Sequence, residues 1–127
     1  MTEAHCSAIS GYRLLLVEDD YFIASDVALW LESNGASVLG PVGSVGEALD
    51  ALAENPAGVD VAVLDINLGK ERVFPVADAL ATADLPFLFL TGYDKEAIPE
   101  GYRHVPRCPK PLDRDLLIRM IAAALKG

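Results

Sequence analysis

A chain of 127 residues, 52% of them hydrophobic, has the length and composition of one folded domain and excludes an intrinsically disordered protein. The formal net charge of −9 argues against a nucleic-acid partner, because phosphate contacts need clustered Lys and Arg. No apolar run approaches the roughly 20 residues of a membrane-spanning helix, so we expect no membrane contact.

Residues 1–11 show no periodic pattern and are predicted to be a flexible tail, with one domain at 12–127. Five short apolar runs then have the length and composition of strands. They are Leu14–Val17, Val38–Leu39, Val61–Leu64, Phe87–Leu90 and Val105–Cys108. Because the last run contains Pro106, it suits only an edge strand.

Helical segments separate these strands. Ser44 and Glu47 form a capping box that opens the second helix, and Pro75 suits the first turn of the third. Between the fourth and fifth strands, Pro99 permits at most a short helix. Strands alternating with helices predict βαβ units and right-handed crossovers. We therefore predict an α/β fold with a doubly wound, five-stranded parallel sheet, flavodoxin-like in its order 2-1-3-4-5, with helices on both faces and a short or irregular fourth helix.

In such a sheet the functional groups collect at the carboxyl ends of the strands. Charged and hydroxyl side chains follow four of the five predicted strands and should meet at this rim: Glu18, Asp19, Asp20, Asp65, Thr91 and Lys110. Carboxylates held close together repel, which raises the pKa of at least one unless a cation lies between them. Mg²⁺ prefers oxygen ligands of this kind, so the rim is predicted to bind it.

Four residues are candidates for the metal site. Asp19 and Asp65 would bind Mg²⁺ directly, Glu18 would hold it through water, and Asn67 would offer its backbone carbonyl.

The same rim suits phosphoryl transfer, which needs positioning and charge neutralisation. Asp65 is the candidate nucleophile, since a carboxylate can attack phosphorus and form an aspartyl phosphate. Lys110 would pair with the phosphoryl oxygens, and Thr91 would donate its hydroxyl to one of them. Taken singly, each feature also fits a structural role: Asp20 suits a helix N-cap, and Asp65 suits a turn. Their joint occurrence, each directly after its strand, favours the phosphoryl-transfer interpretation.

Four motifs carry a resemblance to the receiver domains of two-component signalling: LLLVEDD (14–20), VAVLDINL (61–68), FLFLTGY (87–93) and PKPLD (109–113). The stretches PFLFLTGYD (86–94) and VFPVADAL (73–80) resemble the stand-alone alphaproteobacterial subgroup called FATGUY, although Leu90 replaces the alanine of its motif. The resemblance covers about residues 12–126.

The resemblance implies a role for each rim residue. Glu18 and Asp19 become the acidic pair, Asp65 the phosphoacceptor, Thr91 the switch hydroxyl and Lys110 the family's lysine. It also implies that the protein is a signalling protein rather than an enzyme, with a histidine kinase as its phosphodonor.

By the same resemblance, the residues two beyond the acceptor and two beyond the switch threonine tune the phosphoryl lifetime. These positions are Asn67 and Tyr93.

Two features depart from the family pattern. Arg107 stands three residues before the lysine, where the family has an aromatic side chain, so a rotating aromatic switch at that position is doubtful. The fourth helix is short or absent, and we hypothesise that phosphorylation orders residues 93–104.

Charge is unevenly distributed along the chain. Residues 1–94 carry 15 acidic and 3 basic residues, whereas residues 95–127 carry 4 acidic and 7 basic ones. We therefore expect a downstream protein partner to contact the 93–127 region. Two cysteines, Cys6 and Cys108, make no disulfide framework, and no leader precedes the domain, which predicts a cytoplasmic protein.

Alternative functions remain open. A receiver-like interaction module that ignores phosphorylation is consistent with Arg107 and with the irregular 94–104 segment. A flavin binder would need a Ser/Thr-rich phosphate loop after the first strand, where this chain has three acids. An aspartate-nucleophile phosphatase would need a second Asp at the position of Asn67.

Overall fold

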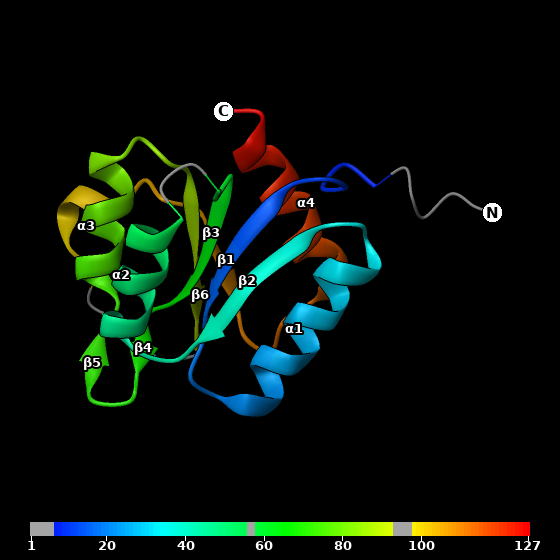
Figure 1. Ribbon diagram of the computed structural model, residues 1–127. Helices are drawn as coiled ribbons and strands as arrows, with labels where there is room; N and C mark the ends of the chain where they lie inside the picture. The colour runs from blue at the N-terminus through cyan, green and yellow to red at the C-terminus, as the bar shows by residue number, and fades with distance from the viewer. Residues whose placement is uncertain (1–6, 56–57, 93–97) are drawn as a thin grey trace.

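The computed structural model describes residues 7–55, 58–92 and 98–127. Five strands form one parallel sheet in the spatial order β2-β1-β3-β6-β7 (Figure 1). Their bounds are β1 Arg13–Val17, β2 Ser37–Val42, β3 Val61–Asp65, β6 Phe87–Thr91 and β7 Arg107–Pro109. Numbered along the chain, this is the predicted order 2-1-3-4-5, so the fold-class prediction is confirmed.

Helices cover both faces of the sheet (Figure 1). On one face lie α1 (Tyr21–Ser33) and α4 (Arg114–Leu125), and on the other lie α2 (Val45–Glu54) and α3 (Phe74–Thr82). Because successive strand residues point to opposite faces, β1 supplies Leu14 and Leu16 to the first core and Leu15 and Val17 to the second.

Side-chain caps fix where α1 and α2 begin. Asp20 accepts hydrogen bonds from the backbone N–H groups of Phe22 and Ile23, at 2.9 and 3.1 Å, and so caps α1. Ser44 accepts from the N–H of Glu47 at 3.1 Å, as the predicted capping box requires. The carboxylate of Glu47 reaches one residue further back, to the N–H of Gly43 at 3.0 Å.

A hairpin that the sequence did not predict follows the third strand of the sheet. Its two short strands, β4 (Asn67–Leu68) and β5 (Glu71–Arg72), pair antiparallel. Gly69 occupies the turn with φ +67°, a conformation that favours glycine. A Cβ at Gly69 would lie 3.7 Å from a carboxylate oxygen of Asp19, so the turn passes close to the acidic rim.

The glycine-rich stretch before α2 has a structural role. Strand β2 extends beyond the predicted Val38–Leu39 and includes Gly40, whose φ is +99°. A Cβ at Gly40 would lie 2.9 Å from the carbonyl oxygen of Leu16 on the neighbouring strand. Only glycine fits this close approach of the two backbones.

The connection between β6 and β7 agrees with the prediction of a short or irregular helix. In its described part, residues 98–106, the helical element is the single 3₁₀ turn η2, Glu100–Tyr102. Residues 93–97, and with them Tyr93, lie outside the described residues, as does part of the segment hypothesised to become ordered.

The described part of the predicted tail, residues 7–11, lies against the domain. Ile9 is fully buried in the core under α1 and α4, and the N–H of Gly11 donates to the carbonyl of Gly35 at 2.9 Å. Residues 1–6 lie outside the described residues, so the division of the chain at residue 11 stays a prediction. Among the helices that the structure describes, none combines the length and the apolar character needed to cross a bilayer.

Candidate functional site

Three carboxylates meet where the central strands end. Asp65 is the last residue of β3, and Glu18 and Asp19 directly follow β1, its neighbour in the sheet. One oxygen from each of the three lies within 4.8 Å of the others. Glu18 and Asp65 are only 3% and 5% exposed, whereas Asp19 is open to solvent. The predicted acidic rim therefore exists as a compact cluster.

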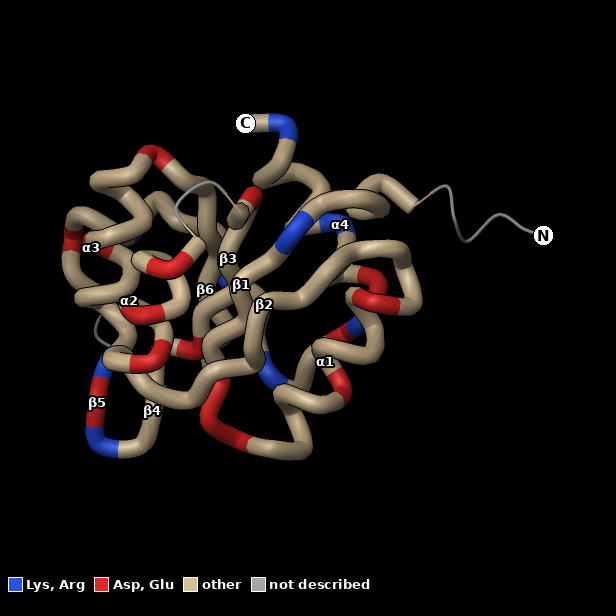
Figure 2. The backbone as a smooth tube through the Cα atoms, in the orientation of Figure 1, with Lys and Arg blue, Asp and Glu red and all other residues tan. Residues whose placement is uncertain are grey.

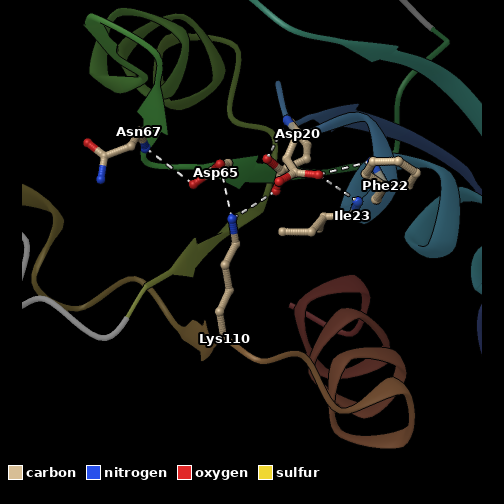
Figure 3. Close-up of polar contacts among 7 residues, drawn as sticks. Asp20, Phe22, Ile23, Asp65, Asn67 and Lys110 are labelled. Atoms are coloured by element: carbon tan, nitrogen blue, oxygen red, sulfur yellow. Dashed lines mark hydrogen bonds and ion pairs between the residues drawn. The ribbon is translucent and has the colours of Figure 1, made fainter.

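Lys110 reaches this cluster from the end of β7 (Figure 3). Its ammonium nitrogen lies 3.2 Å from Oδ2 of Asp65 and 3.1 Å from Oε1 of Glu18. Two nearby carboxylates outweigh the burial that would otherwise lower the pKa of Lys110, so this pKa is raised. Lys110 is thus a charged point donor between two buried acids.

The environment of Glu18 disfavours the charged form of its carboxyl group. Its Oε2 accepts a hydrogen bond from the backbone N–H of Asp20 at 3.0 Å. Its Oε1 is buried and has the ion pair with Lys110 but no hydrogen bond of good geometry. Burial, followed by the neighbouring Asp65 carboxyl, raises the pKa of Glu18 from 4.5 to about 7.

The donor set fits a small hard cation. Mg²⁺ binds through one or two carboxylates and retains several waters, and this cluster offers a buried pair beside the solvent-exposed Asp19. The buried Oε1 of Glu18, which has an ion pair with Lys110 but no hydrogen bond of good geometry, is a further oxygen that could face a cation. Acidic clusters also occur without ions, but here the buried members carry a cost that a divalent cation would relieve.

Asn67 and Thr91 lie at or just beyond the ends of the two neighbouring strands β3 and β6. The backbone N–H of Asn67 donates to Oδ1 of Asp65 at 3.2 Å, while the side-chain amide points away from Asp65 (Figure 3). Thr91 ends β6, one residue beyond the partner of Asp65 in the strand register. Its carbonyl accepts from the N–H of Lys110 at 2.7 Å. The structure therefore brings every predicted rim residue to one edge of the sheet.

Asp20 belongs to the helix rather than to the cluster. Figure 3 shows its carboxylate turned toward Phe22 and Ile23, whose N–H groups it caps. This is the structural role that the sequence also allowed for it.

Aromatic side chains form a second cluster, which the sequence did not single out. Tyr102 of η2 contacts three phenylalanines: Phe74 of α3, and Phe87 and Phe89 of β6. The only sequence signal was the spacing of the two strand phenylalanines, because residues two apart on a strand share a face.

Arg107 is exposed, and its guanidinium donates to the carbonyl of Arg103 at 3.0 Å.

A search of solved structures gives close matches along nearly the whole chain. The solution structure of SdrG from Sphingomonas melonis Fr1 matches with a TM-score of 0.79 and 36% identity, covering 95% of this chain and 99% of that one. The response regulator PhyR from Brucella abortus matches with a TM-score of 0.78 and 25% identity, covering 94% of this chain and 50% of that one. This chain belongs to the response-regulator receiver family.

Other receivers agree in fold. A receiver-domain protein from Clostridium thermocellum, at 23% identity, has a TM-score of 0.78 and covers 91% of this chain and 94% of that one. No protein-family model matches the chain. The prediction of a receiver domain is confirmed by the match to SdrG.

Proposed function

We propose that this receiver accepts a phosphoryl group on Asp65 from a histidine kinase, in a Mg²⁺-dependent reaction, and signals through protein contact. The observation that carries the proposal is the position of Asp65, which is buried between Glu18 and Lys110 at the carboxyl end of β3. In this position the Asp65 carboxylate has the Lys110 ammonium on one side and the carboxylates of Glu18 and Asp19 nearby. Such an arrangement suits a phosphoryl acceptor, which needs positioning and charge neutralisation.

The transfer step balances without a further reactant. A carboxylate oxygen of Asp65 attacks the phosphorus of a phosphohistidine, an O–P bond forms, and the P–N bond breaks. The histidine nitrogen leaves with the bonding electron pair. Lys110, now 3.2 Å from Asp65, then pairs with a phosphoryl oxygen, and the Thr91 hydroxyl donates to another.

The acidic side of the rim has a separate task. Asp19, Asp65, the backbone carbonyl of Asn67 and, through water, Glu18 would hold Mg²⁺. When bound, the ion neutralises charge on the phosphoryl oxygens. Glu18 and Asp19 keep the site too negative for a phosphoryl group unless a cation is present, which makes phosphorylation dependent on the metal.

Mass spectrometry after incubation with acetyl phosphate and Mg²⁺ tests this proposal. We expect an adduct of ~80 Da on the wild type and none on Asp65→Asn. Asp26→Asn, which changes an exposed carboxylate on α1, is the matched control and should keep the adduct. An adduct that persists in Asp65→Asn would remove Asp65 from this role.

The distribution of charge and the family resemblance support proposals about the partner and the cellular location. The described residues 98–127 carry six basic and three acidic side chains, whereas the helices α2 and α3 carry acids and no Lys or Arg (Figure 2). This contrast supports a downstream partner that contacts the 93–127 region. We propose a cytoplasmic protein of the FATGUY subgroup, on the resemblance carried by residues 73–80 and 86–94.

A second candidate function is a receiver-like interaction module that does not depend on phosphorylation. The exposed Arg107 at the usual aromatic position favours it, because the family's switch lacks its usual side chain. Binding of a partner that is equally tight for the wild type and for Asp65→Asn, with and without acetyl phosphate, would support this alternative.

A further inference from the structure

The 98–104 segment is attached to the domain through the aromatic ring of Tyr102. This ring stacks on Phe74 of α3 with a centroid distance of 6.0 Å and an interplanar angle of 7°. It also meets Phe87 and Phe89 edge-on, at 6.0 and 6.2 Å. Contacts of this geometry contribute beyond the apolar area that they bury.

A hydrogen bond completes the attachment. The Tyr102 hydroxyl donates to Oδ1 of Asp78, which is exposed on α3. Burial and the nearby Asp78 raise the pKa of Tyr102 to about 12, so the hydroxyl keeps its proton at neutral pH and can donate. The bond joins the connection between β6 and β7 to a helix on the other side of the aromatic cluster.

The same cluster leads to the rim. Phe87, Phe89 and Thr91 alternate along β6 and so lie on one face of the strand, the face that α3 covers. Thr91 ends this row at the acidic cluster, and the Phe89 ring beneath it contacts Tyr102. A movement of Thr91 toward a phosphoryl group would therefore disturb the packing on which Tyr102 rests.

We infer that Tyr102 is the positioning residue of the switch, taking the part of the aromatic that is missing at Arg107. Its hydroxyl bond to Asp78 holds the 98–104 segment in the arrangement in which Lys110 pairs with the Asp65 carboxylate. Phosphorylation works against this bond, and the freed segment changes the surface offered to a partner. For the described residues 98–104 this is the opposite of the ordering hypothesised from the sequence. The inference rests on the proposed function, because it requires that Asp65 takes up a phosphoryl group.

Tyr102→Phe tests the inference, since it removes the hydroxyl and keeps the stacked ring. If the bond opposes switching, its loss lets the protein bind the phosphoryl mimic beryllofluoride with Mg²⁺ about 5-fold more tightly, as expected for an allosteric coupling. Asp78→Ala should give the same gain, and the double variant no further gain, because both changes remove one interaction. Tyr12→Phe, which removes a hydroxyl outside the cluster, should leave the affinity unchanged.

A merely structural role predicts a different result. In that case Tyr102→Phe would lower the thermal unfolding temperature without changing the affinity for beryllofluoride, and the inference would be overturned. Weaker binding by Tyr102→Phe would overturn it as well, because the bond would then belong to the phosphoryl-bound arrangement. The affinity for Mg²⁺ alone should be the same in both proteins, since Tyr102 lies outside the acidic cluster.

The wild-type measurement separates this inference from the proposed function. A wild type that binds no beryllofluoride and forms no acetyl-phosphate adduct overturns both. A wild type that binds beryllofluoride, combined with a Tyr102→Phe variant of equal affinity, overturns the role of Tyr102 alone. Hydrogen exchange of residues 98–104 that is faster in Tyr102→Phe than in Tyr12→Phe would support the inference.

Discussion

The two halves of the rim differ in how firmly the fold holds them. On the β1–β3 side, every residue of β3 and all but the first of β1 are buried, and both strands have neighbours on each side. On the β6–β7 side, β7 is a three-residue edge strand with exposed Arg107 and Pro109, reached from a single 3₁₀ turn.

The difference separates two tasks. The acids that would hold the metal and the phosphoryl group come from the β1–β3 side, where burial fixes the positions of Glu18 and Asp65 before any ligand arrives. Thr91 and Lys110 come from the half with fewer buried contacts, where a small change in contacts can shift the backbone. A receiver needs both, because chemistry requires fixed groups and signalling requires an element that moves.

Core substitutions should show the largest contrast between the halves. Leu64→Ala on β3 removes a fully buried side chain and should lower the free energy of unfolding by about 2–5 kcal/mol. Ile98→Ala, on the partly buried segment before β7, should cost about 1 kcal/mol, since less apolar area is lost. Urea denaturation of both variants measures this, and equal losses would remove the distinction between the halves.

Lys110→Met tests what the β6–β7 side contributes to the phosphorylation of Asp65. Without the ammonium, the rate of phosphorylation by acetyl phosphate should fall about 100-fold, because a preorganised charge at the phosphoryl oxygens is lost. The affinity for Mg²⁺ should rise, since Lys110 no longer competes for the carboxylates of Glu18 and Asp65. Lys126→Met at the exposed end of the chain is the control. A parallel loss of metal affinity and rate would contradict these opposed effects.

The sequence predicted the β1–β3 side better than the β6–β7 side. Continuous apolar runs such as Val61–Leu64 mark buried parallel strands, and the carboxyl-end rule then places Asp65 and Glu18 together without knowledge of the contacts. The cap by Asp20 was also predictable, because it depends on neighbours in sequence.

What the sequence missed depends on contacts between distant residues. Nothing local marks the pairing of Tyr102 with Asp78, which lie 24 residues apart. The burial of Ile9 in a predicted tail depends on the strand and helices that it meets only in the fold. The short hairpin after β3 was missed because Asn67 and Leu68 form too brief a pattern to show alternation.

Glu18→Gln tests how much the ionised, buried carboxylate of Glu18 lowers the free energy of unfolding. The pKa of Glu18 is raised to about 7, so the stability contributed by its protonated form is full below pH 4.5 and is lost as the pH rises through 7. Glutamine does not ionise, so this variant should exceed the Mg²⁺-free wild type at pH 8 by on the order of 2 kcal/mol. The difference should vanish at pH 4.5. Urea denaturation at both pH values measures this difference. A variant that is less stable than the wild type at pH 8 would contradict the claim that the ionised Glu18 destabilises the fold.

Asp20→Ala should have the smallest effect, because it removes a cap and no rim charge that contacts Lys110. Losing hydrogen bonds to the N–H groups of Phe22 and Ile23 should lower the free energy of unfolding by about 1 kcal/mol. Acetyl-phosphate labelling of Asp65 should stay within about twofold of the wild type, since the Asp20 carboxylate caps α1 rather than joining the acidic cluster. A loss of labelling comparable to that of Lys110→Met would instead place Asp20 in the metal site. Asp20 would then belong to the metal site together with Glu18 and Asp19, and it would also cap α1.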